Sequence, residues 1–266
     1  CLVGSEMCIR DRGWSSPEVI GCFAVAAAAL IVFIVRELRC ENPLLNLKLL
    51  GERNFGVSMA VLAIFGIGML GGTYLLPLYM QKGLGYTAIM AGSVFLPVGL
   101  IQGVLSTCSG FLTRYIKPLF IAVTGILVMT LSFYFASRFT FHTTHAQIML
   151  VLYLRGFGMG LTFAPLNDFS LMNLSQRDMA SAAGISNSIK QLSGSVSIAL
   201  LTVILTGRTA FHSAQGGLSS AESYVAGISD DFLFVTFVSL ASALPFLWLL
   251  RPRRKAASFK SERTGT

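Results

Sequence analysis

Seven long apolar runs constrain this chain more than any other feature of its sequence. They cover approximately residues 18–35, 55–80, 88–112, 118–136, 146–169, 183–206 and 232–250. Each approaches or exceeds the ~20 apolar residues that a helix needs to cross the hydrocarbon core of a bilayer. None alternates with the period of two that a transmembrane barrel strand shows. Because backbone groups in lipid must bond within their own segment, the sequence predicts an all-α integral membrane protein with seven transmembrane helices.

The composition excludes several other classes of protein. Hydrophobic residues make up 54% of the 266 residues and charged residues only 12%, against about 25% charged in a typical soluble domain. The net charge is +8, but the basic residues lie in loops and a tail between the apolar runs, so we expect no nucleic-acid partner. No Walker loop, dinucleotide fingerprint, HExxH or GxSxG pattern occurs. We therefore expect no enzyme, no cofactor and no metal site.

Lysine and arginine residues in the loops predict the orientation. If the first run starts outside, the inner segments hold thirteen of these residues and the outer loops hold three. The prediction is a multi-pass protein of the cell (inner) membrane with a cytoplasmic C-terminus. The basic tail, 251–266, includes RPRRK, which we interpret as an inside anchor in preference to an anionic-lipid switch.

The N-terminal part of the chain divides into two segments. Residues 1–12, CLVGSEMCIRDR, resemble the in-frame translation of a sequencing adapter, so we expect them to be non-native and the chain to be a fragment. Residues 13–54 contain the first transmembrane run and a short leucine-rich connector. We expect that connector to lie along the cytoplasmic interface.

Polar side chains within the apolar runs are the candidates for function, because polar groups at membrane depth are costly and usually face protein or a wet cavity. The runs at 118–136 and 232–250 contain no charge, amide or histidine. We therefore expect four helices around a polar centre, with these two as lipid-facing supports. The candidates for a substrate cavity are Tyr74, Gln102, Arg155, Asn187, Lys190 and Gln191.

Arg155 is the strongest of these candidates. It lies about nine residues into its run, near mid-bilayer, where a cation costs at least ~2.5–3.5 kcal/mol. An acidic partner or water in a cavity must offset that cost; the alternative to a functional role is a buried structural pair. Asn187, Lys190 and Gln191 share one helix face, although Lys190 is close enough to the cytoplasmic end for its ammonium to reach the interface.

A second group of residues is predicted to act in gating or packing. Its members are Gly110, Arg114, Gly156, Gly160, Pro165 and Asp168. Glycines four residues apart allow close helix packing, which is either static or a sliding surface. Pro165 favours a helix break near the inner mouth, where Asp168 is either part of the gate or a simple interfacial charge. The three histidines (His142, His145 and His212) fall in predicted outer loops and are expected to be solvated.

Five blocks of sequence carry a resemblance to a known family. They are GWSSPE at 13–18, RELRCENPLLNLKLLGERNF at 36–55, YLLPLYMQKGLGYTAIMAGSVFLPVG at 74–99, LRGFGMGLTFAPL at 154–166 and ASAAGISNSIKQLSGSVSIAL at 180–200. In this order they resemble the fourteen-span drug:proton antiporters of the EmrB/QacA group, in the major facilitator superfamily. The resemblance implies that the first run is the last linker helix. Residues 55–250 would then be the C-terminal six-helix domain, with inverted repeats at 55–137 and 146–250.

The resemblance also implies a function: proton-coupled efflux of amphipathic drugs or other organic compounds by alternating access. The implied partners are a small organic substrate, protons, the lipid bilayer, a periplasmic adaptor and the N-terminal half of the same protein. The family's proton-coupling acids belong to that other half. The loop SGFLTRYIKP at 109–118 resembles the family's gating loop, with Gly110 in place but Arg114 where an acid is expected. A heptahelical receptor, a binding-only or scaffold membrane protein, and an exporter of one specific metabolite remain as alternatives.

Overall fold

The computed structural model describes residues 17–39, 46–171, 174–176, 178–214 and 219–245, and these residues form helices and connections without any strand. Seven of the described helices are long and apolar enough to cross a membrane, which confirms the predicted all-α membrane fold. They are α2 (Pro17–Arg39), α3 (Arg53–Leu78), α4 (Ala88–Leu112), α5 (Pro118–Ala136), α6 (His145–Leu171), α7 (Met179–Ala214) and α8 (Ser220–Ala241). Two short turns, η1 (Leu47–Gly51) and η2 (Tyr79–Gly83), precede and follow α3.

Local chemistry explains how α3 ends and α4 begins. Pro77 lies inside α3, where it has no N–H to give to the preceding turn, and the next turn, η2, is a π-helix. Gly85 has a φ of 71°, a left-handed conformation that glycine adopts without steric cost. Thr87 then caps α4, its Oγ1 accepting from the backbone N–H of Met90 at 3.3 Å.

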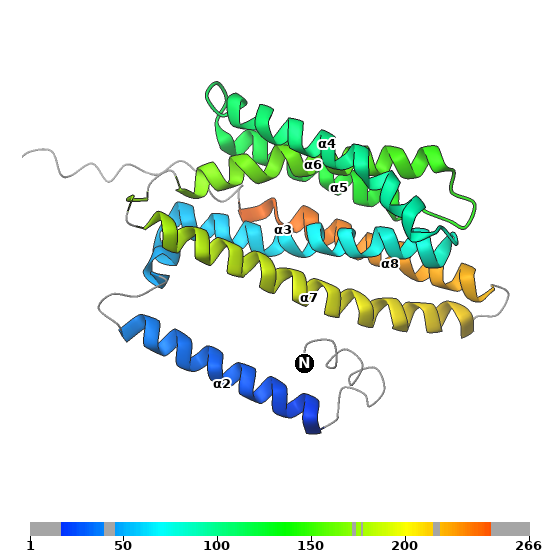
Figure 1. Ribbon diagram of the computed structural model, residues 1–266, viewed down its shortest axis with the longest axis horizontal. Coiled ribbons are helices and arrows are strands. Elements are labelled where there is room, and N and C mark those ends of the chain that lie inside the picture. The colour runs from blue at the N-terminus through cyan, green and yellow to red at the C-terminus, as the bar shows by residue number, and fades with distance from the viewer. Residues whose placement is uncertain (1–16, 40–45, 172–173, 177, 215–218, 246–266) are drawn as a thin grey trace, which may run out of the picture.

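Helices α3 to α8 form one bundle, while α2 lies apart from it (Figure 1). Within the bundle, α3 and α6 touch each other. Helix α4 packs against α6, and α7 packs against α3. Likewise α5 packs against α6, and α8 packs against α3. The bundle can thus be divided into two three-helix units, α3–α5 and α6–α8. In each unit the second and third helices pack against the first helix of the other unit, as expected for inverted three-helix repeats.

Glycines set the closest approaches in the bundle. A Cβ on Gly158 of α6 would lie 2.8–2.9 Å from backbone and Cβ atoms of Met129 in α5, and one on Gly160 would lie 2.7 Å from Cβ of Leu105 in α4. Helix α6 thus packs closely against both α4 and α5. Large side chains fill the rest of the core; among the most fully buried are Phe55, Phe65, Tyr79, Phe133 and Phe232.

The last two transmembrane helices differ from the predicted runs. Helix α7 continues beyond 206 to Ala214, and α8 begins at Ser220 instead of 232. The start of α8 is fixed by a capping box, in which Ser219 and Glu222 bond each other's backbone N–H. The uninterrupted apolar run starts only at 232, because Glu222, Asp230 and Asp231 lie in the first part of α8. The expectation that the last span carries no charge is therefore wrong.

Several predicted segments lie outside the described residues. These are residues 1–12 and the basic tail at 251–266. The connector is described from Asn46 onward, and it docks against the start of α7: Asn46 N donates to Ser181 Oγ at 3.2 Å, and Asn46 Nδ2 donates to Asp178 Oδ1 at 3.1 Å. Leu49 of η1 is buried. The described part of the connector is thus attached to the bundle.

Candidate functional site

A cavity of about 310 Å³ lies among α3, α6 and α7, at the predicted cytoplasmic end. It is lined by Leu62, Phe163, Asn167, Leu171, Ala183, Ser186, Asn187 and Lys190. Lys190 Nζ lies 5.1 Å from the centroid of the Phe163 ring, close enough for a cation–π interaction. The cavity therefore combines an aromatic surface, two amides and one cation, and it brings together two of the predicted residues, Asn187 and Lys190.

A row of exposed polar side chains continues along α7. Asn187, Gln191 and Ser195 are four residues apart and all exposed. At membrane depth such groups face protein or water and not lipid. On α4, Cβ atoms built on Gly99 or Gly103 would meet nothing within 4 Å. The six-helix bundle alone thus leaves a polar face of α7 and a small-residue face of α4 uncovered.

Arg155 does not line this cavity. Its side chain is 4% exposed and is directed at α3, where it donates to the carbonyl oxygens of Met69 and Gly72, at 3.0 Å each, and to Thr73 Oγ1. Within the described ranges no carboxylate forms an ion pair with it. Two backbone carbonyls and one hydroxyl of α3, four to eight residues before Pro77, therefore bind this cation and join α6 to α3. Its Nε is buried without a hydrogen-bond partner among the described residues.

The two remaining cavity candidates lie elsewhere in the bundle. Tyr74 Oη is 3.4 Å from Thr202 Oγ1, which connects α3 with α7. Gln102 is half-buried on α4, and its backbone oxygen would lie 3.0 Å from a Cβ on Gly160. A Cβ on Gly156 would lie 3.2 Å from the Val98 oxygen. The structure places Gly156 and Gly160 in direct contact between α6 and α4.

The predicted gating residues meet where α6 ends beside the α4–α5 connection. Asp168 is exposed and accepts from Thr113 Oγ1 at 3.5 Å. Thr113 Oγ1 also donates to the Gly110 oxygen at 2.7 Å. Arg114 is exposed, with its guanidinium 5.7 Å from the Phe111 ring. Although position 114 is not acidic, the structure supplies a carboxylate to this connection from Asp168. Pro165 is buried within α6, which continues past it to Leu171, so the predicted helix break at this residue is wrong. Packed membrane helices tolerate proline because their neighbours satisfy the freed backbone group.

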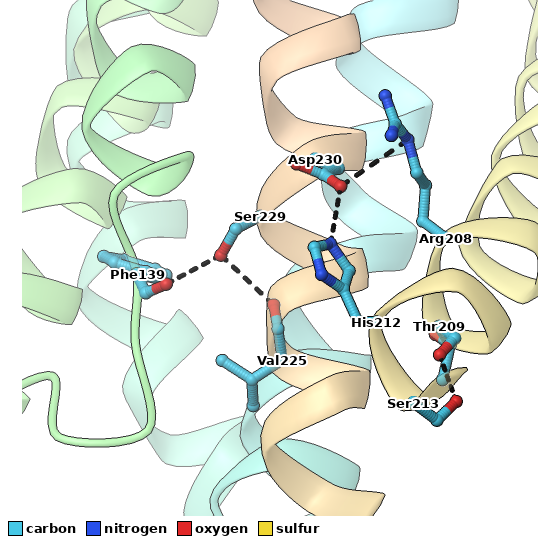
Figure 2. Close-up of polar contacts among 8 residues, drawn as sticks. All are labelled: Phe139, Arg208, Thr209, His212, Ser213, Val225, Ser229 and Asp230. Carbon is cyan, nitrogen blue, oxygen red and sulfur yellow. Dashed lines mark hydrogen bonds and ion pairs between the residues drawn. The ribbon is translucent and has the colours of Figure 1, made fainter. Parts of the chain in front are cut away.

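Sequence reasoning missed a charged cluster between α7 and α8 (Figure 2). Asp230 Oδ2 lies 3.0 Å from His212 Nε2 and 3.5 Å from Arg208 Nε. The expectation that His212 is a solvated loop residue is wrong, because it lies in the last turn of α7 and pairs with α8. The i, i+4 spacing of Arg208 and His212, with two consecutive aspartates downstream, was the available signal.

Asp231, the second of these aspartates, is fully buried. Neither of its carboxyl oxygens has a hydrogen-bond partner among the residues that the structure describes. It is the most deeply buried acidic side chain of the described part of the chain. Its neighbour Asp230 is half-buried and paired, so the two aspartates have different surroundings.

Comparison with known proteins identifies the family. The sequence model of the major facilitator superfamily matches residues 4–198. The chain belongs to the major facilitator superfamily. It is therefore a multi-pass membrane protein of a transporter family and not an enzyme, and the predicted family resemblance is confirmed.

Individual relatives carry transporter names as well. The chain is 32% identical to the uncharacterized MFS-type transporter YhcA of Bacillus subtilis over 76% of its length, and 30% identical to the multidrug export protein EmrB of Escherichia coli over 80%. It is 25% identical to the fatty acid resistance protein FarB of Neisseria gonorrhoeae over 94%. These matches cover 38%, 43% and 57% of the three relatives. The chain thus spans about half the length of the curated relatives it matches.

Proposed function

We propose that this chain is the C-terminal half of a proton-coupled exporter of amphipathic organic compounds, with its C-terminus in the cytoplasm. The observation that carries the proposal is the uncovered polar face of α7 beside the cavity of α3, α6 and α7. In a bilayer, exposed amides at 187 and 191 require water or a second protein surface. An N-terminal half packed against α4 and α7 supplies that surface and encloses a central path.

The chemistry of the cavity suits an amphipathic compound. Phe163 and the aliphatic lining residues bury an apolar body, while Asn167, Asn187 and Lys190 orient a polar group. Arg155 acts beside the cavity as a positioning residue, since it joins the α3 and α6 walls. Transport then proceeds by rocking of the two halves about this site.

The test is efflux of a fluorescent dye from cells that carry the gene restored to full length. Asn187→Ala and Gln191→Ala each remove a polar contact to substrate, so we expect the concentration for half-maximal efflux to rise by about fivefold to tenfold, as for one lost hydrogen bond. Gln81→Ala, at an exposed position in η2, is the matched control and should leave efflux unchanged. Normal efflux in both α7 variants contradicts the proposed substrate path.

Three further measurements test other parts of the proposal. Arg155→Ala should reduce efflux at normal expression, and unchanged efflux removes its positioning role. The 266-residue chain in liposomes should not transport without its other half. Competition between dyes and unrelated amphipathic compounds tests the range of substrates: efflux restricted to one compound favours the exporter of a specific metabolite.

A further inference from the structure

One face of α8 runs through the junction of three helices. Gly227, Asp231, Val235 and Ser239 are spaced four apart and so share that face. A Cβ on Gly227 would lie 2.7–3.3 Å from Leu205 and Thr209 of α7, and a Cβ on Gly68 of α3 would lie 3.6–3.7 Å from Val235 and Ser239. Asp231 lies between these contacts, where α3, α7 and α8 meet.

Asp231 is the unusual residue of this face. Its side chain is 0% exposed, and both carboxyl oxygens are without a hydrogen-bond donor among the described residues. An isolated carboxylate in such surroundings is strongly disfavoured, and the group escapes the penalty by binding a proton. The geometry therefore favours the neutral acid in the conformation seen here.

Buried hydroxyl groups lead from Asp231 toward the α7–α8 loop. Ser223 Oγ, two turns before Asp231 on the same helix face, and Thr209 Oγ1 of α7 are both buried and lack a partner in the described part of the chain. Thr209 Oγ1 would lie 2.7 Å from a Cβ on Gly227, midway between Ser223 and Asp231. Eight residues of α-helix span about 12 Å. Buried polar groups therefore lie along α8 from its loop end to Asp231, near the middle of the helix.

The ionisable groups around Asp231 lie on α8 itself and on the neighbouring elements α7, α3 and η2. Asp230 of α8 and Arg208 of α7 act on it electrostatically, and Asp230 is itself paired with Arg208 and His212. Tyr224 on α8 interacts electrostatically with Asp231 and with Tyr74 of α3, and Lys82 of η2 lies 5.9 Å from the Tyr224 ring. Helix α5 contains no charged residue. Since Asp230 already has cationic partners, Asp231 is the unpaired acid of the pair.

We propose that Asp231 is a proton-binding carboxyl of this half, reached from the α7–α8 end past Ser223 and Thr209. In the step, a carboxylate oxygen of Asp231 takes up one proton and becomes the neutral acid; release returns the carboxylate when the surrounding helices move apart. The role of this proton in coupling rests on the proposed exporter function. The binding of the proton itself does not.

Chemical labelling tests proton binding without transport. Dicyclohexylcarbodiimide modifies carboxyl groups that are protonated and in apolar surroundings, and peptide mass spectrometry locates the adduct. In the full-length protein in liposomes we expect labelling at Asp231 that falls as the pH rises, and none in Asp231→Asn. Labelling at Asp230 in its place, or no labelling of Asp231 at any pH, overturns the proposal.

Transport in the same liposomes tests coupling. Asp231→Asn should lose substrate accumulation driven by a pH gradient by about a hundredfold, as on removal of a positioned proton-transfer group, while substrate counterflow without a gradient persists. Glu52→Gln, at an exposed acid before α3, should retain both. Gradient-driven accumulation at the wild-type level in Asp231→Asn overturns the coupling role.

A conservative variant covers the case in which Asp231→Asn loses both activities. Asp231→Glu retains an acid and should keep accumulation with a shifted pH profile; an unshifted profile counts against the proposal. If the wild type itself accumulates nothing under a pH gradient, the proposed proton coupling fails, whereas the labelling result still decides whether Asp231 binds a proton.

Discussion

The units α3–α5 and α6–α8 pack in corresponding ways but bury different chemistry. In each unit the second and third helices pack against the first helix of the other unit. Helices α7 and α8 also pack closely against each other, whereas α4 and α5 make no comparable contact. The ion pairs of Asp230 lie in that additional interface (Figure 2). The two units therefore share the same pattern of helix contacts without sharing buried charges: the aspartate pair, Asp230 and Asp231, lies in α6–α8 and has no counterpart in α3–α5.

The two units also differ in how closely their third helices approach the opposite unit. In the α5–α6 contact, a Cβ on Gly158 would lie 2.8–2.9 Å from backbone atoms of Met129. In the corresponding α3–α8 contact, a Cβ on Gly68 would lie 3.6–3.7 Å from side-chain atoms of Val235 and Ser239. Side chains can move to accommodate a methyl group, while a packed helix backbone cannot. The first contact should therefore tolerate substitution much less.

The largest expected effect follows from this difference. Gly158→Ala should lower the free energy of unfolding by about 1–3 kcal/mol, the usual cost of overpacking. Gly68→Ala should raise it by about 0.5–1 kcal/mol, since alanine is the better helix former and has room. Thermal unfolding in detergent, followed by circular dichroism, measures both. Equal destabilisation by the two substitutions contradicts the distinction between the contacts.

The third helices of the two units begin differently, which gives the next prediction. Helix α8 starts with the capping box of Ser219 and Glu222, whereas α5 starts with Pro118 and no side-chain cap from Lys117. Ser219→Ala should destabilise the first turn of α8 by about 1 kcal/mol, and Lys117→Ala should leave α5 unchanged. Hydrogen exchange of the first-turn amides reports each helix separately. Equal protection in Ser219→Ala and wild type rules out a stabilising role for the cap.

The sequence predicts the helices better than the polar contacts between them. Lipid imposes a minimum length and apolarity, so the seven spans are recognisable from hydropathy alone. The start of α8 was missed, because a capping box and not apolarity sets it, and Asp231 was overlooked with it. The position of Arg155 was recognisable, but its partners are carbonyls of α3. Such partners depend on how two helices are rotated against each other, which single-helix periodicity does not specify.

The α5–α6 connection is held by one hydroxyl from each unit, and their contributions should differ. Tyr79 of η2 donates to the Thr140 oxygen at 2.8 Å. Ser229 of α8 donates to the Phe139 oxygen at 2.7 Å and also to Val225, in its own helix, at 3.1 Å. Tyr79→Phe should cost about 1 kcal/mol, a typical net hydrogen bond. Ser229→Ala should cost less, because its hydroxyl is shared. Urea unfolding in detergent compares them, and a larger loss in Ser229→Ala reverses the expected order.

The smallest expected effect concerns the starts of α4 and α7, the second helices of the two units: only the start of α7 should respond to pH. Asp178, immediately before α7, accepts from Ser175 Oγ at 2.7 Å and from Asn46 Nδ2 at 3.1 Å. These hydrogen bonds, Ser175 first, lower the pKa of Asp178 below its usual 3.8. Thr87, which caps α4, does not titrate.

A carboxyl whose pKa is lower in the folded protein stabilises it above the unfolded value, and that stabilisation is lost as the pH falls through the folded value. Docking of the Asn46 connector should therefore weaken in acid below about pH 3.8, while the start of α4 does not respond. Limited proteolysis of the connector by an acid-active protease measures this. In the Asp178→Asn variant the connector should be cleaved at a rate that no longer depends on pH in that range, because asparagine does not titrate. If this variant keeps the pH dependence of the wild type, the effect belongs to another group.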